Sequence, residues 1–215
     1  MALDHVYVNS KTTNIQIKGA FHSKGQIRSG LRHNGREGKE GSGKHINKEL
    51  SYLNEEIKSA TADEIYLNLC NRLTKENYTL NNMPDKDDIR IDGKKIRSDA
   101  VIAYEIEASY PGDMVWSMTD KDGNIIPVPD EIDIIPENVN NYFKMPKDMK
   151  EFNEWKNATV EFINDRYGSK NIMSISVHMD EDEPHIHAIG LPIIENDDKV
   201  RLAIYVHIGH LMCRE

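Results

Sequence analysis

The sequence predicts an α+β fold, built as one main domain of strands and helices. Its 215 residues are enough for one well-buried core. Residues 171–178 (NIMSISVH) and 185–194 (HIHAIGLPII) are two apolar-rich runs joined by the polar stretch MDEDEP, a pattern typical of an antiparallel hairpin. Residues 147–166 precede it with apolar side chains at helical spacing, and Gly168 ends that pattern. We therefore expect an antiparallel strand pair beside an amphipathic helix.

Four further elements are predicted from the period of their apolar residues. Residues 3–9 alternate as a strand, and residues 100–108 (AVIAYEIEA) form a second candidate strand. A helix is expected from residue 47 to about residue 58, and another from residue 61 to about residue 77. We find no internal repeat.

Two segments lack such a pattern. Residues 18–44 are rich in Gly, Ser and basic side chains, which predicts a mobile basic loop between the first strand and the helices. Residues 109–146 are rich in Pro, Asp and Glu and contain the turn signal DKDGN at 120–124, so we expect an inserted acidic loop or hairpin there.

The charge is unevenly distributed. The formal net charge of −9 argues at first against a nucleic-acid partner, because phosphate binding depends on Lys and Arg. Residues 18–48, however, hold eight Lys and Arg against two Glu, so a basic arm is attached to an acidic body. Alone, such a run is more often a solvated loop than a DNA-binding segment.

The cysteines and the apolar runs indicate the compartment. Cys70 and Cys213 have neither the number of a disulfide framework nor the paired spacing of a zinc site, which favours reduced residues of a cytoplasmic protein. The N-terminal stretch MALDHVYVNS lacks the basic and apolar regions of a signal peptide. We expect no membrane segment, since no run approaches roughly 18 apolar residues.

Three histidines of the predicted hairpin form a candidate metal site. His185 and His187 are two residues apart on one strand, so both side chains leave the same face, and His178 ends the facing strand. A lone histidine is more often an ordinary hydrogen-bonded residue, but three imidazoles in register favour a bound divalent ion. In the acidic turn between the strands, Glu181 is the candidate for orienting a ligand or accepting a proton.

Four motifs resemble one known family. The segment HMDEDEPHIH, residues 178–187, resembles the third motif, HxDE..PHxH, of the MobV (Mob/Pre) family of plasmid mobilisation relaxases. Residues 33–36, HNGR, are similar to its first motif, HNxR, and Asn47 and Asn54 fall where that family has its I-N and L-N pair. KKIRSDAVIAYE, residues 94–105, resembles the family's basic residues followed by R-x-D-A-V and a later Glu. Four motifs in the expected order are far more specific than an isolated H-x-H.

The resemblance implies a fold and a reaction. Such relaxases resemble the wider HUH endonucleases, in which a central antiparallel sheet carries the His-hydrophobe-His pair and helices flank it. The implied activity is metal-dependent, site- and strand-specific nicking of DNA at an origin of transfer, through a covalent link to the 5′ phosphate that is later rejoined. The family's nucleophile is the histidine of the first motif, which here is His33. Near pH 7 a neutral imidazole has a free lone pair for such an attack.

The resemblance also implies roles for other residues and for a metal. Arg36 and Arg97 are expected to stabilise negative charge on the phosphate, and Glu181 and Glu105 to hold the imidazoles, although each has a plain structural alternative. The implied ion is Mn²⁺ or Mg²⁺, with Zn²⁺ as the alternative that three imidazoles favour. The partners would be single-stranded and supercoiled plasmid DNA and the conjugation machinery. The expected DNA contacts are Arg28, Arg32, Asn34, Lys44, Asn47 and Asn54.

The resemblance to the family motifs extends to about residue 195. We expect a relaxase domain over residues 1–195, with residues 109–146 inserted, and a divergent or truncated segment over residues 196–215. Two other classes stay open: a non-catalytic DNA-binding module, and a three-histidine metallohydrolase that activates water with Glu181. A metal-dependent nicking assay separates the first from a relaxase, and binding of single-stranded DNA at low salt separates the second.

Overall fold

A six-stranded antiparallel sheet is the centre of the fold. The computed structural model describes residues 4–8, 11–35, 46–135, 138–196 and 199–202. The sheet has the order β1-β2-β6-β11-β10-β3. Its strands are β1 (Asp4–Val8), β2 (Lys11–Phe21), β3 (Glu55–Lys58), β6 (Ala103–Ser109), β10 (Ile172–His178) and β11 (His185–Gly190). The expected α+β architecture, a central antiparallel sheet flanked by helices, is confirmed.

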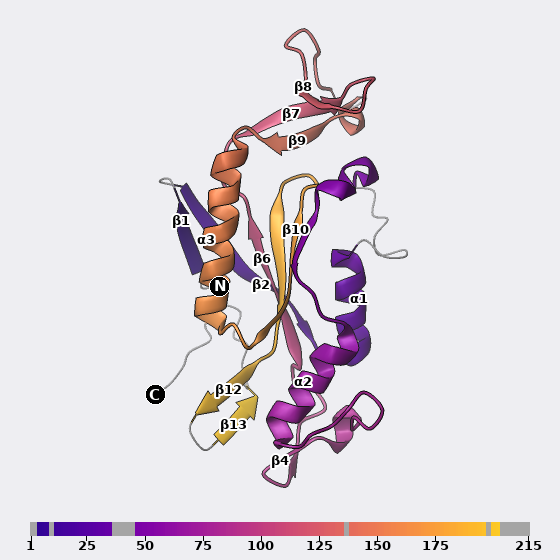
Figure 1. Cartoon of the computed structure of the whole chain (residues 1–215), viewed down its shortest axis with the longest axis vertical. Coiled ribbons are helices and arrows are strands. Elements are labelled where there is room, and N and C mark those ends of the chain that lie inside the picture. Colours follow the sequence, from indigo (N-terminus) through magenta and orange to yellow (C-terminus); the bar gives the residue numbers. More distant parts are fainter. Residues whose placement is uncertain (1–3, 9–10, 36–45, 136–137, 197–198, 203–215) are drawn as a thin grey trace.

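Helices cover both faces of this sheet (Figure 1). Helix α3 (Met149–Tyr167) packs on one face, where Trp155 joins Ile186 in a buried cluster. Helices α1 (Lys24–Asn34) and α2 (Ala62–Thr74) pack on the other, where Ile27 and Leu69 meet Ile189. Because side chains alternate along a strand, the even and odd positions of β11 serve different cores.

The elements nearest the C-terminal motif follow the sequence prediction closely. Asp148 caps α3 by accepting hydrogen bonds from the backbone of the first turn, and Gly168 ends the helix at a φ of 84°. Strands β10 and β11 form the expected antiparallel hairpin, in which His178 lies directly opposite His185. The chain then forms a second, separate hairpin of β12 (Ile193–Asn196) and β13 (Lys199–Leu202).

The expected loop over residues 18–44 is wrong for its first part. Residues 11–21 form β2 and residues 24–34 form α1, where the side chain of Ser23 caps the helix by accepting from the backbone N–H of Gln26. Gly30 is needed by packing, because a Cβ there would lie 2.8 Å from Cζ of Phe21. The later part of this segment, with Arg36 and Lys44, lies outside the described residues.

The helix expected over residues 47–58 is also wrong. The chain instead forms a 3₁₀ helix, η2 (Lys48–Leu53), followed by β3, which pairs with β10 at the edge of the sheet. The side chain of Asn54 explains the break, because it binds the backbone N–H of Met179 and the carboxylate of Asp180 rather than its own helix. The helix expected over 61–77 is α2, which begins with a capping box at Thr61.

The segment expected as an acidic loop or hairpin forms a small three-stranded sheet of order β8-β7-β9. Its strands are β7 (Met114–Thr119), β8 (Ile125–Pro127) and β9 (Phe143–Pro146). Phe143 and Met145 belong to the α3-side core, so the small sheet is packed on the main body. Figure 1 shows it at the end of the molecule where the β10–β11 hairpin turns.

The remaining short elements lie outside the main sheet. They are η3 (Lys86–Asp88), β4 (Arg90–Ile91), β5 (Lys94–Lys95) and η4 (Val139–Asn141). Within the described ranges, no helix combines the length and the hydropathy that a membrane crossing requires. The expected domain boundary after residue 195 stays a prediction.

Candidate metal centre and nicking site

One face of the main sheet is apolar at one end and polar at the other. At one end, Ala103 and Ile189 pack against α1 and α2. At the other end, the same face carries polar side chains from the two central strands. Opposite His187 lies Glu107 in the β6–β11 ladder, and opposite His185 lies His178 in the β10–β11 ladder. The polar half of this face is the candidate site.

The three predicted metal ligands converge in this polar half. His178, His185 and His187 are buried, and one nitrogen from each lies within 4.8 Å of the others. Their ring centroids are 4.8–5.1 Å apart. Three nitrogens on one ion at about 2.0–2.2 Å each lie about 3–3.8 Å from one another. The rings therefore have to close by about 1 Å, a change that side-chain rotation can supply, for all three to share an ion.

Each of the three imidazoles has a hydrogen-bond acceptor beside the ring nitrogen that would not bind the ion. Nε2 of His178 donates to the backbone carbonyl of Asn34 at 2.8 Å, and Nδ1 of His185 donates to the carbonyl of Glu183 at 2.7 Å. Nδ1 of His187 lies 3.0 Å from Oε1 of Glu105. A carbonyl or carboxylate only accepts, so these contacts place the N–H there and leave a lone pair on the opposite nitrogen. The donor set therefore fits a divalent metal.

The protonation of the site agrees with this assignment. Burial lowers the pKa of His185, which favours the neutral imidazole that a metal needs. Burial raises the pKa of Glu105, but the contacts with His187 and Asn34 outweigh it, so the net pKa is lowered. Glu105 is thus a carboxylate at neutral pH and accepts from His187.

Glu181 lies among the lone-pair nitrogens. Its carboxylate is 3.6 Å from Nδ1 of His178 and 3.8 Å from Nε2 of His185. Its contact with His33 places it between that ring and the rings of His178 and His185. Glu181 was expected to orient a ligand imidazole or to accept a proton, and its carboxylate lies on the side of the rings where an ion would lie.

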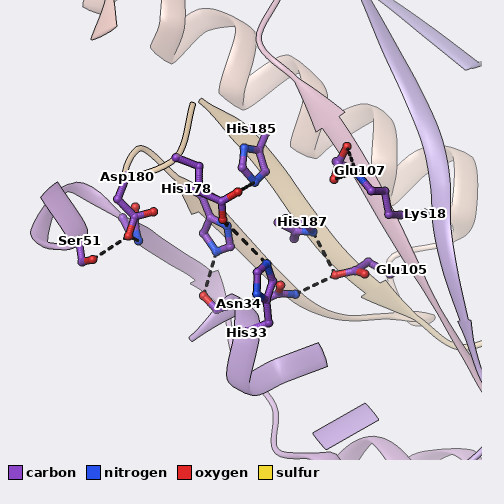
Figure 2. A network of polar contacts seen from close by, with 12 residues as sticks. Lys18, His33, Asn34, Ser51, Glu105, Glu107, His178, Asp180, His185 and His187 are labelled. Atoms are coloured by element: carbon purple, nitrogen blue, oxygen red, sulfur yellow. Dashed lines mark hydrogen bonds and ion pairs between the residues drawn. The ribbon is translucent and has the colours of Figure 1, made fainter. Parts of the chain in front are cut away.

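His33 borders the same space from the last turn of α1. Its Nε2 is 3.8 Å from Oε1 of Glu181, and its ring centroid is 6.0 Å from that of His187. The side chain is 35% exposed, whereas the three histidines of the metal site are buried. The site thus combines an accessible imidazole with an enclosed group of three (Figure 2).

A large cleft of about 1390 Å³ opens beside His185 and Glu181. One wall comes from the main body and includes Lys18, Lys48 and Glu107, and the other comes from the small β8-β7-β9 sheet and the residues around it. That volume exceeds the roughly 300–1,000 Å³ of a small-molecule pocket, which suits a polymeric substrate better.

Comparisons with known proteins point to one family. Residues 130–206 match the family model described as plasmid recombination enzyme. Over 182 residues the chain is 28% identical to plasmid recombination enzyme type 1 of Staphylococcus aureus. This match covers 84% of the present chain and 34% of the Staphylococcus aureus protein. Both matches show that the chain is similar to members of the plasmid recombination enzyme (Mob/Pre) family. It spans about a third of the length of that curated relative.

Solved structures of this family share the fold. The MobM relaxase domain bound to a 22-nucleotide origin of transfer from plasmid pMV158, with manganese, matches with a TM-score of 0.53. The same domain with a 3′-thiophosphate DNA gives the same score. In both cases the identity is 21%, and the match covers 91% of this chain and 77% of the other.

Three residues expected at the site from the Mob/Pre motifs are not found beside the histidines in the part of the chain that the structure describes. Arg97 is 73% exposed and pairs with Asp99, whose carbonyl contacts the ring of His22 just before α1 begins. His33 is on the last turn of this 11-residue helix, so about 16 Å of helix separates the two regions. The structure therefore does not bring Arg97 to the histidines. Arg36 and Lys44 lie outside the described residues.

The expected DNA contacts divide into two groups. Arg28 and Arg32 are exposed on α1, and Arg28 lies 3.4 Å from Asp63. The asparagines are instead built into the site, where Asn34 is buried and donates to Glu105. Asn47 lines the cleft, and its backbone N–H donates to the carbonyl of Asp180.

A buried carboxylate holds the turn after β10. Asp180 is 1% exposed and accepts from Oγ of Ser51 at 2.6 Å and from Nδ2 of Asn54 at 2.8 Å. These bonds tie the family's I-N and L-N segment to the turn that carries Glu181. Asn54 therefore supports the site rather than facing DNA.

Sequence reasoning missed Glu107 and its partner. The carboxylate of Glu107 is largely buried and lies 2.6 Å from Nζ of Lys18. The signal was present as E-I-E at residues 105–107, which has the same two-residue period as H-I-H at 185–187. Only the pairing of β6 with β11 shows that the two patterns share a face.

Proposed function

We propose that this chain is a plasmid mobilisation relaxase that nicks DNA at an origin of transfer and rejoins it. The observation that carries the proposal is the position of His33 beside three buried histidines, each of which directs one ring nitrogen to a common point. An exposed nucleophile next to a cation site is the arrangement that in-line attack on a phosphodiester requires.

The covalent step uses the imidazole of His33. One of its nitrogens forms a bond to the scissile phosphorus as the bond to the 3′ oxygen breaks. The phosphorylated imidazole releases the proton of its other nitrogen, the 3′ oxygen takes up one proton through solvent and leaves as a hydroxyl, and the 5′ phosphate stays on His33 as a phosphoramidate. A free 3′ hydroxyl later attacks that phosphorus and restores the imidazole. We propose Arg36 for charge stabilisation in this step.

The residues that would hold the ion are His178, His185 and His187. When bound, the metal would neutralise charge on the non-bridging phosphate oxygens. The related MobM domains contain manganese, which supports a divalent ion and, within this proposal, Mn²⁺ over Mg²⁺ or Zn²⁺. Glu105 and the carbonyls of Asn34 and Glu183 would orient the ligands.

The substrate would be a single strand exposed in supercoiled plasmid DNA. The related MobM domains are bound to origin-of-transfer DNA, and the cleft beside His185 is large enough for several nucleotides. Arg28 and Arg32 would contact phosphates from the exposed side of α1. Conjugation proteins would be the further partners of the nicked complex.

A nicking assay tests the proposal. Supercoiled plasmid carrying the DNA that flanks the chain's own gene is incubated with protein and Mn²⁺, with EDTA as control. We expect open circles only with metal, and a protein–DNA adduct that mass spectrometry maps to His33. DNA binding without nicking would favour the non-catalytic module. Hydrolysis of a non-nucleic ester without binding of single-stranded DNA would favour the metallohydrolase.

A further inference from the structure

The small β8-β7-β9 sheet has two unlike faces. Ser117 lies opposite Phe143 in the β7–β9 pairing, and both side chains are buried, that of Phe143 in the α3-side core. The next pair along, Trp116 and Lys144, occupies the other face because side chains alternate. Both residues line the cleft beside the metal site. A large aromatic ring is thus presented to the cleft although the same strands offer a buried face.

Lys144 contacts both the ring of Trp116 and Glu183 in the turn between β10 and β11. Its Nζ lies 5.6 Å from the centroid of the Trp116 ring and 3.5 Å from the carboxylate of Glu183. The carbonyl of Glu183 in turn accepts from His185. The Trp116 ring is therefore placed relative to the metal ligands through one lysine and one turn residue.

The cleft is lined by side chains of both charges and by aromatic rings. Lys18, Lys48 and Lys144 line it together with Trp116 and Tyr142, and five carboxylates line it as well, of which Glu107 and Glu183 pair with Lys18 and Lys144. Single-stranded nucleic acid is held by cations together with aromatic rings, where the cations follow the backbone and the rings stack on bases. A duplex offers no free base face to such a ring, because its bases are already stacked and paired.

We propose that Trp116 stacks on an unpaired base next to the scissile phosphate, and that Lys144 neutralises the phosphate beside that base. The small sheet is then the wall that fixes the position of the strand relative to His33. This inference rests on the proposed relaxase function and assigns part of its substrate site. Stacking tolerates any base, so the contact would supply affinity and position rather than sequence readout.

Tryptophan fluorescence gives a direct test. The chain has two tryptophans, and Trp155 is 1% exposed in the core beneath α3, so a bound base can reach only Trp116. Full-length protein is titrated with an oligo(dT) strand of about a dozen nucleotides. The control is an abasic strand of equal length and charge. We expect quenching and a blue or red shift of the emission with oligo(dT), and neither with the abasic strand.

Two substitutions identify the residue. Trp116→Ala should weaken oligo(dT) binding by about 5- to 150-fold, the value of one base–aromatic stack, and leave binding of the abasic strand unchanged. Trp116→Phe keeps a flat ring, so its affinity should stay close to that of the wild type while the fluorescence response disappears. Should the Ala variant fail to fold, the Phe variant alone still tests the assignment.

The outcomes separate this inference from the function on which it rests. Unchanged quenching in Trp116→Phe, or equal binding of oligo(dT) and the abasic strand by the wild type, would overturn the stacking role. Nicking by the wild type in the plasmid assay would stand in either case. If the wild type neither nicks nor binds single-stranded DNA, the relaxase proposal fails first.

Discussion

The backbone carbonyl of Asn34 accepts a hydrogen bond from Nε2 of His178 at 2.8 Å. The side chain of the same residue donates to Oε1 of Glu105 at 3.2 Å, and that carboxylate faces His187. Asn34 therefore contacts one candidate metal ligand directly and a second through a carboxylate. Since His33 precedes it on the last turn of α1, Asn34 links the candidate nucleophile to the metal site.

Asn34→Ala should weaken metal binding without unfolding the chain. The variant loses the bond to Glu105 but keeps the backbone contact to His178, so one of three ligands loses its orientation. Loss of such a supporting contact typically lowers metal affinity by about 10- to 100-fold. Titration calorimetry with Mn²⁺ measures the change. Asn153→Ala, on the exposed side of α3, is the matched control and should leave the affinity unaltered. Equal affinities for both variants would contradict the coupling.

His33→Ala should abolish nicking and the covalent adduct while single-stranded DNA binding stays largely intact. The DNA contacts proposed for Arg28 and Arg32 and the metal site do not use the side chain of His33. The substitution therefore removes only the covalent step. Gel assays of cleavage and fluorescence anisotropy of binding measure the two effects. The matched control is His22→Ala, which removes an exposed imidazole just before the first turn of the same helix. Cleavage at the wild-type rate by the His33 variant would rule out this nucleophile.

The metal-free protein should lose stability as the pH falls below about 6.5. Burial lowers the pKa of His185 in the folded state, whereas an unfolded histidine titrates near about 6.5. Below that pH the unfolded chain binds a proton that the folded chain does not, so acid favours unfolding until the folded pKa is reached. Thermal melts between about pH 7.5 and pH 5.5 measure the trend. His185→Gln should flatten it, and an identical slope in that variant would contradict the assignment.

Asp180→Ala should destabilise the fold by about 2–3 kcal/mol. The change leaves the donors on Ser51 and Asn54 without their buried acceptor, and an unsatisfied group of this kind costs about 1–3 kcal/mol. Urea unfolding measures the free energy of unfolding. Asp182→Ala, two residues away and exposed, should change it by less than about 0.5 kcal/mol. A similar loss in both variants would show that charge, and not the hydrogen bonds, is responsible.

Gly190→Ala should cost about 1–3 kcal/mol of stability through overpacking. A Cβ at this position would lie 2.6 Å from Cζ of Tyr104, whose ring is fully buried between the sheet and α3. Gly25→Ala is the control, because its Cβ would meet only an ordinary contact at 3.8 Å and α1 would gain helix propensity. Chemical denaturation of the two variants should therefore give opposite or clearly unequal shifts.

The parts of the fold that sequence predicts well are those fixed by local pattern. The β10–β11 hairpin and α3 follow from alternation, from helical spacing and from the glycine at position 168. The hairpin in turn brings the three histidines together, since a short turn sets the register of both strands. Glu105 was found through the motif, and its carboxylate lies 3.0 Å from Nδ1 of His187.

The parts that sequence predicts poorly depend on contacts between distant segments. Helix α1 contains Gly25 and Gly30 and buries only one large apolar side chain, Ile27, so its local signal is that of a loop. It is stabilised by packing on α2 and β2. Residues 47–58 have a helical period, but the side chain of Asn54 is recruited by Met179 and Asp180. The register of β6 against β11, which places Glu107 in the site, has no local signal at all.

The arrangement of the ligands has a consequence for the order of folding. All three candidate metal ligands lie on one hairpin within residues 178–187, whereas Asn34 and Glu105 come from segments far away in the chain. Closing so short a loop costs little entropy, while assembling distant strands is the slow part of folding. A divalent ion can therefore cross-link the nascent hairpin before α1 and β6 dock on it. The three ligands are thus fixed by the hairpin itself, whereas the contacts that orient them require α1 and β6 to dock on it.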